Sequence, residues 1–562
     1  MEHLIKCLNK KILVLNNSME NYLQKYVSDD RPAIFLNLFR PEKVLDAYRE
    51  YIKAGADIIL TNTSGAIRPI LKKYRASRDL NAINIKSVEI ARQALGNHVY
   101  IGGNIGSAGI NIEPFGNVEF DDAVEIYNEQ IRALLKAGVD LLFIRSMKCI
   151  QNLRAAVIAA NSLRNDIPLI AHATFDENGL MDSGTNIETF AAIMEGLNVD
   201  VIGVNYSNNL NSVIKNLSKN SNLPISIELS SDNLSEALEH IDSLVEAGVN
   251  IVSCGSGIKP DDICMIADSV KGKKVNCRKN EIPFRITSRT STVKIGNSLP
   301  FVKIGERINP TGRKSLAGSI SEGRTDLIVK EAISQYKHGA DALDVNIGVP
   351  MTDEVQMMQE AVKIIQDSVP IPLVLDSASP SVIEAGLKRY AGKALVNSVN
   401  GKEKQIRDLL PIVKKYGASL IALTIADTIP ETAEDRLKIA TLIVSACENY
   451  GIKRENIIVD TAALAVATSS DSGQQILNAV RLIKQELGLP VSLGVSNVSF
   501  GLPSRALIHN TFLVQAIAMG LDAAILNPLD KQVHEIIAAA SLFAGRDKYC
   551  MNFIKMIRSK KA

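Results

Sequence analysis

Residues 51–60, YIKAGADIIL, join the end of an amphipathic helix to a short apolar strand through a glycine. The same cassette returns at residues 135–143, LKAGVDLLF, and further copies centre on Gly248, Gly339 and Gly520. The glycine is needed because the helix ends in a left-handed residue, a conformation that side chains disfavour. Helices and strands that alternate at this pace predict parallel βαβ units.

The number of apolar runs predicts the architecture. Up to about residue 268, such runs lie near Leu13, Phe35, Ile59, Tyr100, Phe143, Ile170, Ile202, Ile227 and Ile251. From residue 301 onward, eight runs end near Glu306, Asn346, Asp376, Asn397, Thr424, Asp460, Asn497 and Asn527. Eight is the number that a closed barrel needs, and active sites of such barrels lie at the carboxyl ends of the strands. We therefore predict an α/β protein of two consecutive (β/α)8 TIM barrels, residues 1–270 and 299–562, joined by a basic linker over residues 271–298.

The linker is polar and shows no periodic apolar pattern. Its cations are Lys271, Lys273, Lys274, Arg278, Lys279, Arg285 and Arg289. We interpret it as a solvated connection between the barrels. The alternative is a binding patch for an anionic tail.

Composition excludes several classes of function. The chain of 562 residues has a net charge of +2, no Trp and 5% aromatic residues, so we expect no nucleic-acid partner. No apolar run is long enough to span a membrane, and the N-terminus lacks the apolar core of a signal peptide. The seven cysteines are odd in number and lack CxxC spacing, which is typical of reduced thiols. We expect a cytoplasmic protein without a membrane association.

Polar side chains gather at the predicted strand ends of the second barrel, and none of them is a His. The set consists of Glu306, Asn309, Asp344, Asn346, Asp376, Asn397, Ser398 and Asp460, followed by Asn497 after the seventh run. Buried carboxylates are costly unless they are paired or hydrogen-bonded, so this rim predicts a ligand with several N–H donors, such as a pterin ring. For any single position, the alternative is an N-cap of the following helix.

Five segments carry a resemblance to known families: GERINPTG at 305–312, LDVNIG at 343–348, LDS at 375–377, VNSVN at 396–400 and GVSNVSFGLPSR at 494–505. They resemble the pterin-binding domain of cobalamin-dependent methionine synthase and of the methyltetrahydrofolate:corrinoid/iron–sulfur protein methyltransferases. Dihydropteroate synthase shares the fold, but its Asn-x-Thr-Pro-Asp-Ser-Phe loop and Ser-Arg-Lys phosphate site are replaced here.

The resemblance implies roles for these residues. Tetrahydrofolate or 5-methyltetrahydrofolate is the implied substrate, and Asn497 is expected near N5 of its pterin. The implied pterin site comprises Glu306, Asn309, Asp344, Asn346, Asp376, Asn397, Ser398, Asp460, Asn497 and Arg505. Arg505 and Arg313 are candidates for the glutamate carboxylates of the folate, or are simply surface residues.

The leaving group sets the chemistry. When the methyl group leaves, N5 must gain a proton or a strong hydrogen bond, because an amide anion is an impossible leaving group. We expect Asn497 to donate to N5 as charge develops, in a network that includes Asp460 and water. Asn497 and Asp460 are therefore the predicted catalytic residues.

The first barrel resembles the homocysteine-binding barrel of the same methionine synthases at residues 61–66, 172–176 and 201–205, TNTSGA, HATFD and VIGVN. That family activates homocysteine with a zinc ion held by three cysteines. Here Tyr206 takes the first cysteine position, and only Cys254 remains in the later motif, SCGSG at 253–257. Arg145 also stands where the family has a carboxylate. We therefore expect no zinc, and either a non-catalytic docking barrel or a pocket for another small molecule near Arg145 and Cys254.

The chain has no Asp-x-His-x-x-Gly loop of the kind that binds cobalamin. The resemblance therefore implies that the corrinoid is carried by a partner protein. The predicted function is methyl transfer between N5 of tetrahydrofolate and the cobalt of that separate corrinoid protein. The alternatives are a methionine synthase component that methylates homocysteine, and a non-catalytic folate-binding or scaffold protein.

Overall fold

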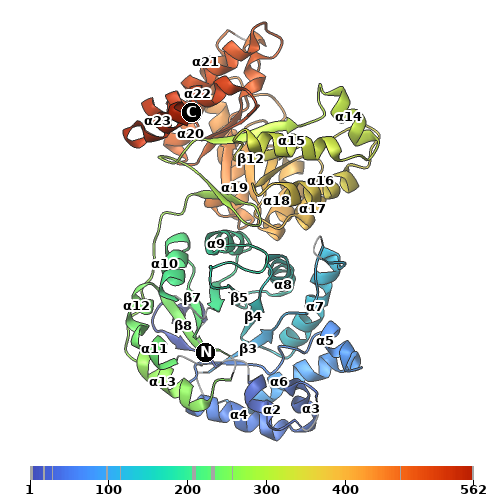
Figure 1. The fold of residues 1–562 in the computed structure, drawn as a ribbon, viewed down its shortest axis with the longest axis vertical. Coiled ribbons are helices and arrows are strands. Elements are labelled where there is room, and N and C mark those ends of the chain that lie inside the picture. Colours follow the sequence, from blue (N-terminus) through green and yellow to red (C-terminus); the bar gives the residue numbers. More distant parts are fainter. Residues whose placement is uncertain are drawn as a thin grey trace. The chain divides into compact units, whose positions relative to one another are not determined.

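A computed structural model describes residues 4–16, 19–27, 30–95, 99–113, 116–205, 210–229, 234–255, 257–468 and 470–559. The chain divides into two compact units, Met1–Glu281 and Ile282–Ala562. In each unit a parallel sheet of eight strands is surrounded by helices (Figure 1). The prediction of two consecutive TIM barrels is confirmed.

In the first barrel, a bridge between described residues joins the two end strands of the sheet. Its strands pair in the order β1-β8-β7-β6-β5-β4-β3-β2, and a parallel bridge between Leu15 and Ile58 joins the two ends. The strands are β1 (Leu13–Val14), β2 (Ile58–Leu60), β3 (Tyr100–Ile105), β4 (Leu141–Met147), β5 (Leu169–Thr174), β6 (Val201–Asn205), β7 (Ile225–Leu229) and β8 (Val249–Cys254). The helices are α1 (Leu4–Leu8), α2 (Glu20–Gln24), α3 (Leu36–Phe39), α4 (Pro41–Lys53), α5 (Arg68–Lys73), α6 (Leu80–Ala94), α7 (Phe120–Lys136), α8 (Ile150–Leu163), α9 (Ile187–Gly196), α10 (Leu210–Asn220), α11 (Leu234–Glu239), α12 (Ile241–Glu246) and α13 (Pro260–Val270).

The apolar run at Phe35 is not a strand, and that prediction is wrong. Residues Ala33–Phe35 form the 3₁₀ helix η1, which continues directly into α3. Ile34 and Phe35 are buried against Leu71 and Ile83 of the surrounding helices. A short buried helical turn and a short buried strand have the same apolar pattern, so periodicity cannot distinguish them.

The second barrel closes completely, because β18 pairs with β11 from Val302 opposite Ala523 to Gly305 opposite Leu526. Its strands are β11 (Val302–Ile308), β12 (Ala342–Val345), β13 (Leu373–Asp376), β14 (Leu395–Asn400), β15 (Ser419–Leu423), β16 (Ile457–Asp460), β17 (Val491–Gly494) and β18 (Ala523–Leu526). Its helices are α14 (Lys314–Ser321), α15 (Asp326–Lys337), α16 (Glu354–Ser368), α17 (Pro380–Arg389), α18 (Glu403–Tyr416), α19 (Ala433–Asn449), α20 (Ser472–Glu486), α21 (Arg505–Ala518), α22 (Lys531–Phe543) and α23 (Met551–Ser559).

The seventh strand of this barrel is shorter than predicted. β17 ends at Gly494, and Asn497 lies in the 3₁₀ helix η5 (Val495–Ser499) that follows it. The side chain at Asn497 is therefore presented from a helical turn and not from a strand end. This turn sets the direction of its amide toward the barrel mouth.

A β-hairpin closes the amino-terminal end of the second barrel. Its strands are β9 (Phe284–Thr287) and β10 (Thr292–Ile295), which pair antiparallel. Phe284, Ile286 and Ile295 are buried with the first residues of the barrel strands, among them Ile304, Val374 and Leu395. The hairpin therefore completes the apolar core below the barrel mouth.

The backbone of the hairpin lies close to the loop before β14. A Cβ atom on Gly392 would lie 2.1 Å from the carbonyl oxygen of Thr287, so only glycine fits there. The N–H of Thr287 donates to the Lys393 carbonyl over 2.9 Å, and the Tyr390 hydroxyl donates to the Thr287 carbonyl over 2.7 Å.

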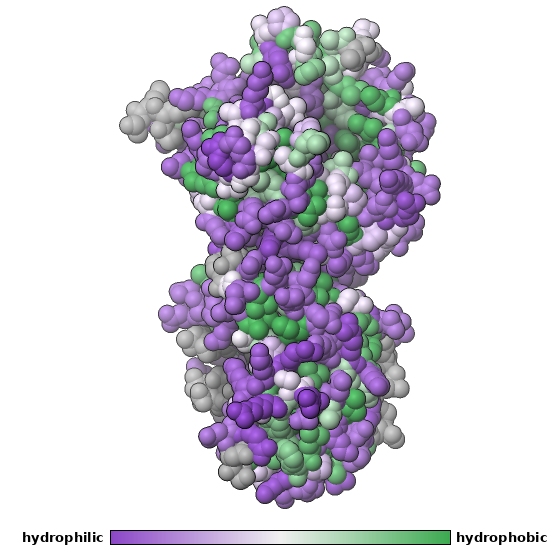
Figure 2. Space-filling model, turned by 90° about the vertical axis from the view of Figure 1, so that its right-hand side faces the viewer, coloured by the Kyte–Doolittle hydropathy of each residue, from purple (hydrophilic) through white to green (hydrophobic). Residues whose placement is uncertain are grey.

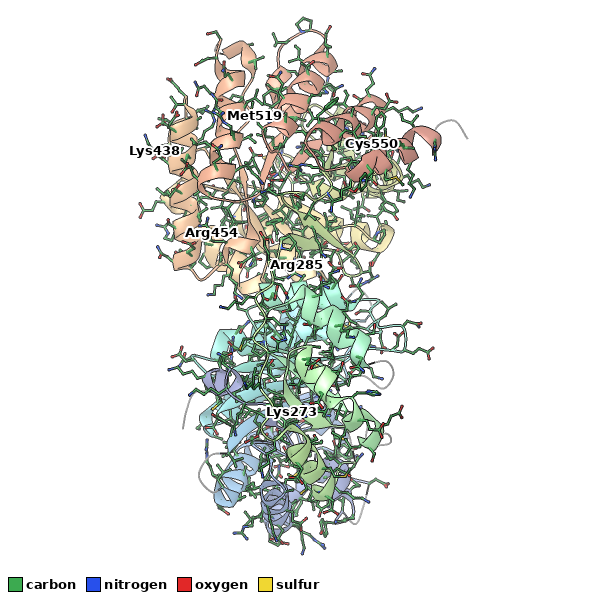
Figure 3. The ribbon with its side chains drawn as sticks, turned by 90° about the vertical axis from the view of Figure 1, so that its left-hand side faces the viewer. Lys273, Arg285, Lys438, Arg454, Met519 and Cys550 are labelled. Atoms are coloured by element: carbon green, nitrogen blue, oxygen red, sulfur yellow. The ribbon has the colours of Figure 1, made fainter. Side chains whose placement is uncertain are left out.

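The segment between the barrels thus differs from the solvated, aperiodic linker expected over 271–298. Arg278 donates to the carbonyls of Ser221, Leu223 and Gly248, and burial lowers its pKa to about 10. Lys273, labelled in Figure 3, pairs with Asp242 of the first unit. Arg285, labelled in the same view, lies in β9 with 2% of its surface exposed. A cationic side chain has a structural role when it donates hydrogen bonds to backbone carbonyls, as Arg278 does. Composition alone does not reveal such hydrogen bonds.

Among the described residues, no helix is long and apolar enough to span a bilayer. The face in Figure 2 is largely hydrophilic on both units, with apolar side chains in scattered groups.

The hairpin yields a test of the fold. Ile286 is fully buried, so Ile286→Ala should lower the free energy of unfolding by about 2–5 kcal/mol, as for other large-to-small core changes. Urea unfolding of the full chain, followed by circular dichroism, measures this loss. Ile429 is 56% exposed, so Ile429→Ala should change stability by less than about 0.5 kcal/mol. Equal losses in the two variants would contradict the role of the hairpin as part of the core.

Candidate functional site

A cavity of about 650 Å³ opens at the carboxyl ends of the second barrel's strands. Its lining contains eight of the ten residues predicted for the pterin site: Glu306, Asn309, Asp344, Asp376, Asn397, Ser398, Asp460 and Asn497. The two exceptions are Asn346 and Arg505. Asn346 donates a hydrogen bond to the lining residue Asp376, and Arg505 lines the adjoining cavity. Residues far apart in the sequence therefore meet in one chamber.

Two amide–carboxylate pairs lie side by side in this chamber. Asn397 Nδ2 donates to Asp344 Oδ1 over 3.0 Å, and Asn346 Nδ2 donates to Asp376 Oδ2 over 3.0 Å. Burial raises the pKa of Asp344 well above its usual value, and the nearby charge of Asp376 raises it further. Burial also raises the pKa of Asp376. Within the described part of the chain, each carboxyl group accepts one side-chain amide hydrogen bond, which leaves acceptor capacity for a ligand.

Asp460 is the third buried carboxyl group of the chamber, with 7% of its surface exposed. Its Oδ1 accepts a hydrogen bond from the backbone N–H of Ala462 over 2.8 Å. Burial raises the pKa of Asp460 to about 7, although the N–H groups of Ala462 and Gly494 favour the ionised form. This carboxyl group can therefore gain or lose a proton near neutral pH.

Asn497 lies in the cavity lining with an exposed side chain. Its Nδ2 atom passes close to Gly494, where an added Cβ atom would lie 3.1 Å away. Glycine at the end of β17 thus gives the amide room to lie over the strand end. The side chain offers both donors and an acceptor to the chamber.

A network beside Asn497 fixes the shape of η5. Ser496 Oγ donates to both carboxylate oxygens of Glu306, at 3.1 and 3.0 Å. Arg505 donates to the Ser496 carbonyl over 2.8 Å and to Ser499 Oγ over 3.2 Å, and its guanidinium lies 5.8 Å from the centre of the Phe500 ring. The structure therefore places Arg505 against the turn that carries Asn497, outside the cavity lining.

The cationic edge of the cavity was only partly predicted. Arg307 and Arg313 both line the cavity, and both pair with Glu331, Arg307 through Nε at 2.7 Å. Arg313 was a candidate for the glutamate tail, whereas Arg307 was missed although it lies inside the motif at 305–312. The apolar lining residues Leu423, Ile425 and Leu464 were also missed, because apolar side chains carry no chemical signal in the sequence.

Comparison with known families separates the two barrels. Residues 13–270 match the homocysteine S-methyltransferase family, and residues 305–527 match the pterin-binding enzyme family. The first barrel is a homocysteine S-methyltransferase domain, and the second is a pterin-binding domain. Methionine synthase of Mycobacterium tuberculosis is 27% identical over 93% of the chain, which includes both domains. The chain spans about half the length of the curated methionine synthases it matches, 48% of each.

Solved structures resemble single barrels. The homocysteine methyltransferase MmuM from Escherichia coli, in its oxidized form, is 19% identical and covers 46% of this chain and 95% of its own, with a TM-score of 0.42. Dihydropteroate synthase from Xanthomonas albilineans, in complex with 7,8-dihydropteroate, is 16% identical and covers 46% of this chain and 98% of its own, with a TM-score of 0.37.

The homocysteine S-methyltransferase domain contains a buried ion pair. Arg145 of β4 lies 2.9 Å from Glu228 of β7, and less than a tenth of either side chain is exposed. The ring of His172 lies 4.7 Å from the Phe143 ring, and burial lowers the His172 pKa to about 4. A neutral His and a paired cation therefore lie where the sequence predicted a pocket.

The described residues of this domain include one of the cysteines considered as a zinc ligand. Cys254 lies at the end of β8 and is fully buried. Tyr206, which takes the first cysteine position, lies outside the described residues. Among the described residues, no group of three or more His, Cys, Asp or Glu side chains could hold a metal ion.

The pKa of Asp460 yields a prediction about stability. It is raised to about 7 in the folded chain, so stability from the neutral carboxyl group is lost as pH rises from about 4 to 7. Asn cannot ionise, so Asp460→Asn should not share this loss. Between pH 5 and pH 8, ligand-free wild type should lose on the order of 1–4 kcal/mol relative to the variant.

Thermal unfolding of both proteins at the two pH values measures this difference. Asp427 is exposed on the same barrel, so Asp427→Asn should follow the wild type at both pH values. If Asp460→Asn and the wild type lose stability equally, Asp460 ionises in the folded chain as it does in water.

Proposed function

We propose that the pterin-binding domain binds a reduced folate and transfers a methyl group between its N5 atom and the cobalt of a corrinoid on a separate protein. The observation that carries this proposal is the chamber of buried carboxyl groups and amides at the barrel mouth. A pterin ring presents an amino group and ring N–H groups in one plane, which complement the carboxylates of Asp344 and Asp376. The methionine synthase relatives support methyl-transfer chemistry for the chain.

The same chamber supplies what N5 needs. The amide of Asn497 can donate to a nitrogen that gains electron density as its methyl group leaves. Asp460 lies in the same lining and holds a proton up to about pH 7. We assign Asn497 to direct stabilisation of the leaving nitrogen and Asp460 to orientation of the pterin through a proton-bearing carboxyl group. Glu306, Asn309, Asn346, Asn397 and Ser398 complete the proposed site.

The corrinoid is proposed as a substrate on a partner, in a transient interface at the open barrel mouth. The chain is proposed to act in the cytoplasm. Either direction of methyl transfer is compatible with the geometry, because the same hydrogen bond stabilises the free amine and the transition state that leads to it.

The catalytic test is Asn497→Ala. Methyl transfer from methyltetrahydrofolate to free Co(I) cobalamin, followed by the cobalamin spectrum, should slow by roughly 10²-fold or more, as for the loss of one preorganised donor. Folate affinity, measured by calorimetry, should change much less. Asn449 is exposed at the end of α19, so Asn449→Ala should retain wild-type rates. If Asn497→Ala transfers methyl groups at the wild-type rate, Asn497 does not stabilise the leaving nitrogen.

A second candidate function is methylation of homocysteine by the first domain. The family match over residues 13–270 favours it, whereas the pairing of Arg145 with Glu228 disfavours it. Zinc analysis of the purified chain and an assay with methylcobalamin and homocysteine test it together. Stoichiometric zinc with homocysteine turnover would support this function. Folate binding without any methyl transfer would instead support a scaffold.

A further inference from the structure

A second cavity, of about 240 Å³, adjoins the folate chamber of the pterin-binding domain. The two cavities share three lining residues, Glu306, Ser496 and Asn527. The other walls of the second cavity come from α21 and the beginning of α22, and include Arg505, His509, Asn510, Leu513 and Asp530. Glu306 therefore stands in the wall between the two spaces.

Two buried polar atoms belong to residues of α21 that line the second cavity. His509 Nδ1 and Asn510 Oδ1 are buried and have no hydrogen-bond partner among the described residues. Asn510 is only 6% exposed, and both residues line the cavity. Buried polar atoms without protein partners are usually satisfied by ordered water when the space is polar and large enough. The cavity is large enough to hold water, and Glu306, Ser496 and Asp530 in its lining offer polar partners.

The charged groups that line the second cavity connect solvent to Glu306. Arg505 is exposed, and His509 is half-buried behind it on the same helix. Burial lowers the pKa of His509 and the charge of Arg505 lowers it further, whereas Asp530 at the start of α22 opposes this change. Burial raises the pKa of Glu306, while the Ser496 hydroxyl and the charges of Arg505 and Arg307 oppose that rise. Two titratable groups therefore line one cavity, one on α21 and one on β11.

Methyl transfer consumes a proton in the direction toward cobalt. The N5–CH3 bond breaks with its electron pair left on N5, the Co(I) corrinoid supplies the pair for the new Co–CH3 bond, and N5 gains one proton. A bound folate and a corrinoid above it would cover the mouth of the main chamber. A proton that arrives during the reaction then needs another entrance.

We propose that the second cavity is a water-filled proton entrance, in which His509 exchanges protons with solvent and Glu306 passes them to the folate chamber. This inference rests on the proposed function and deepens it. His509 is a proton-relay residue, which acts on N5 through water and Glu306. The reverse reaction uses the same path outward.

The test compares pH profiles of methyl transfer in the full chain. Rates from methyltetrahydrofolate to free Co(I) cobalamin are measured between about pH 5.5 and 8.5, across the range in which His titrates. In wild type, a descending limb follows deprotonation of His509. His509→Gln should lose this limb and slow transfer about tenfold at the acid end, less than the roughly 10²–10⁴-fold of direct acid catalysis because water still carries some protons. Folate affinity should stay within about twofold, since His509 does not line the folate chamber.

A second variant moves the limb without removing His509. Asp530→Asn removes the charge that raises the His509 pKa, so the limb should shift to lower pH. Asn preserves the N-cap of α22, where the Asp530 side chain accepts from the Gln532 N–H. The matched control is His338→Gln, because His338 is exposed at the end of α15 and should leave the profile unchanged.

The outcomes separate the inference from the proposed function. Wild-type transfer with unchanged profiles in both cavity variants would overturn the proton entrance and leave the proposed function intact. Loss of folate affinity equal to the loss of rate in His509→Gln would also overturn it, because His509 would then be structural. If wild type binds folate but transfers no methyl group, both the proposed function and the relay are wrong.

Discussion

The cost of burying carboxyl groups at the barrel mouth governs the second domain. Asp344, Asp376 and Asp460 are largely buried, and burial raises the pKa of each. One amide donor for Asp344 and one for Asp376 offset part of the cost but do not remove it. The rest of the barrel core is apolar, and the hairpin of β9 and β10 closes its amino-terminal end. The stability of this core offsets the remaining cost of the buried carboxyl groups. A donor-rich planar ligand would supply the missing hydrogen bonds, so the unfavourable arrangement of the free site becomes binding free energy.

The same constraint explains why the turn after β17 is so heavily supported. A neutral amide such as Asn497 is useful only if its direction is fixed, since a side chain that rotates freely loses most of its electrostatic effect. The Ser496 hydroxyl holds the turn to Glu306, and Arg505 holds it through the Ser496 carbonyl. Arg505 therefore contributes to the site by shaping it, and the cavity that it borders connects this support to solvent.

Much of this arrangement could be predicted from the sequence, because strand ends in a parallel barrel converge and the polar residues there stand out against apolar runs. The missed features share a physical cause. Phe35 lies in a helical turn whose apolar pattern equals that of a strand, and Asn497 follows a strand that ends three residues earlier. Arg278 and Arg285 were assigned to a solvated segment, since composition does not reveal which carbonyls a cation meets. His509 could not be connected to Glu306 either, because only the folded chain brings the two residues to the lining of one cavity and no local pattern encodes it.

The two domains manage buried charge in opposite ways. The pterin-binding domain leaves its carboxyl groups with neutral amides, so their acceptor capacity is available to a ligand. The homocysteine S-methyltransferase domain pairs the buried Glu228 with Arg145, so that carboxylate already has a cationic partner. His172 beside them is held neutral by burial, which removes a second charge from the interior. A ligand of the first domain would therefore have to displace an existing partner, whereas a ligand of the second would supply one that is missing.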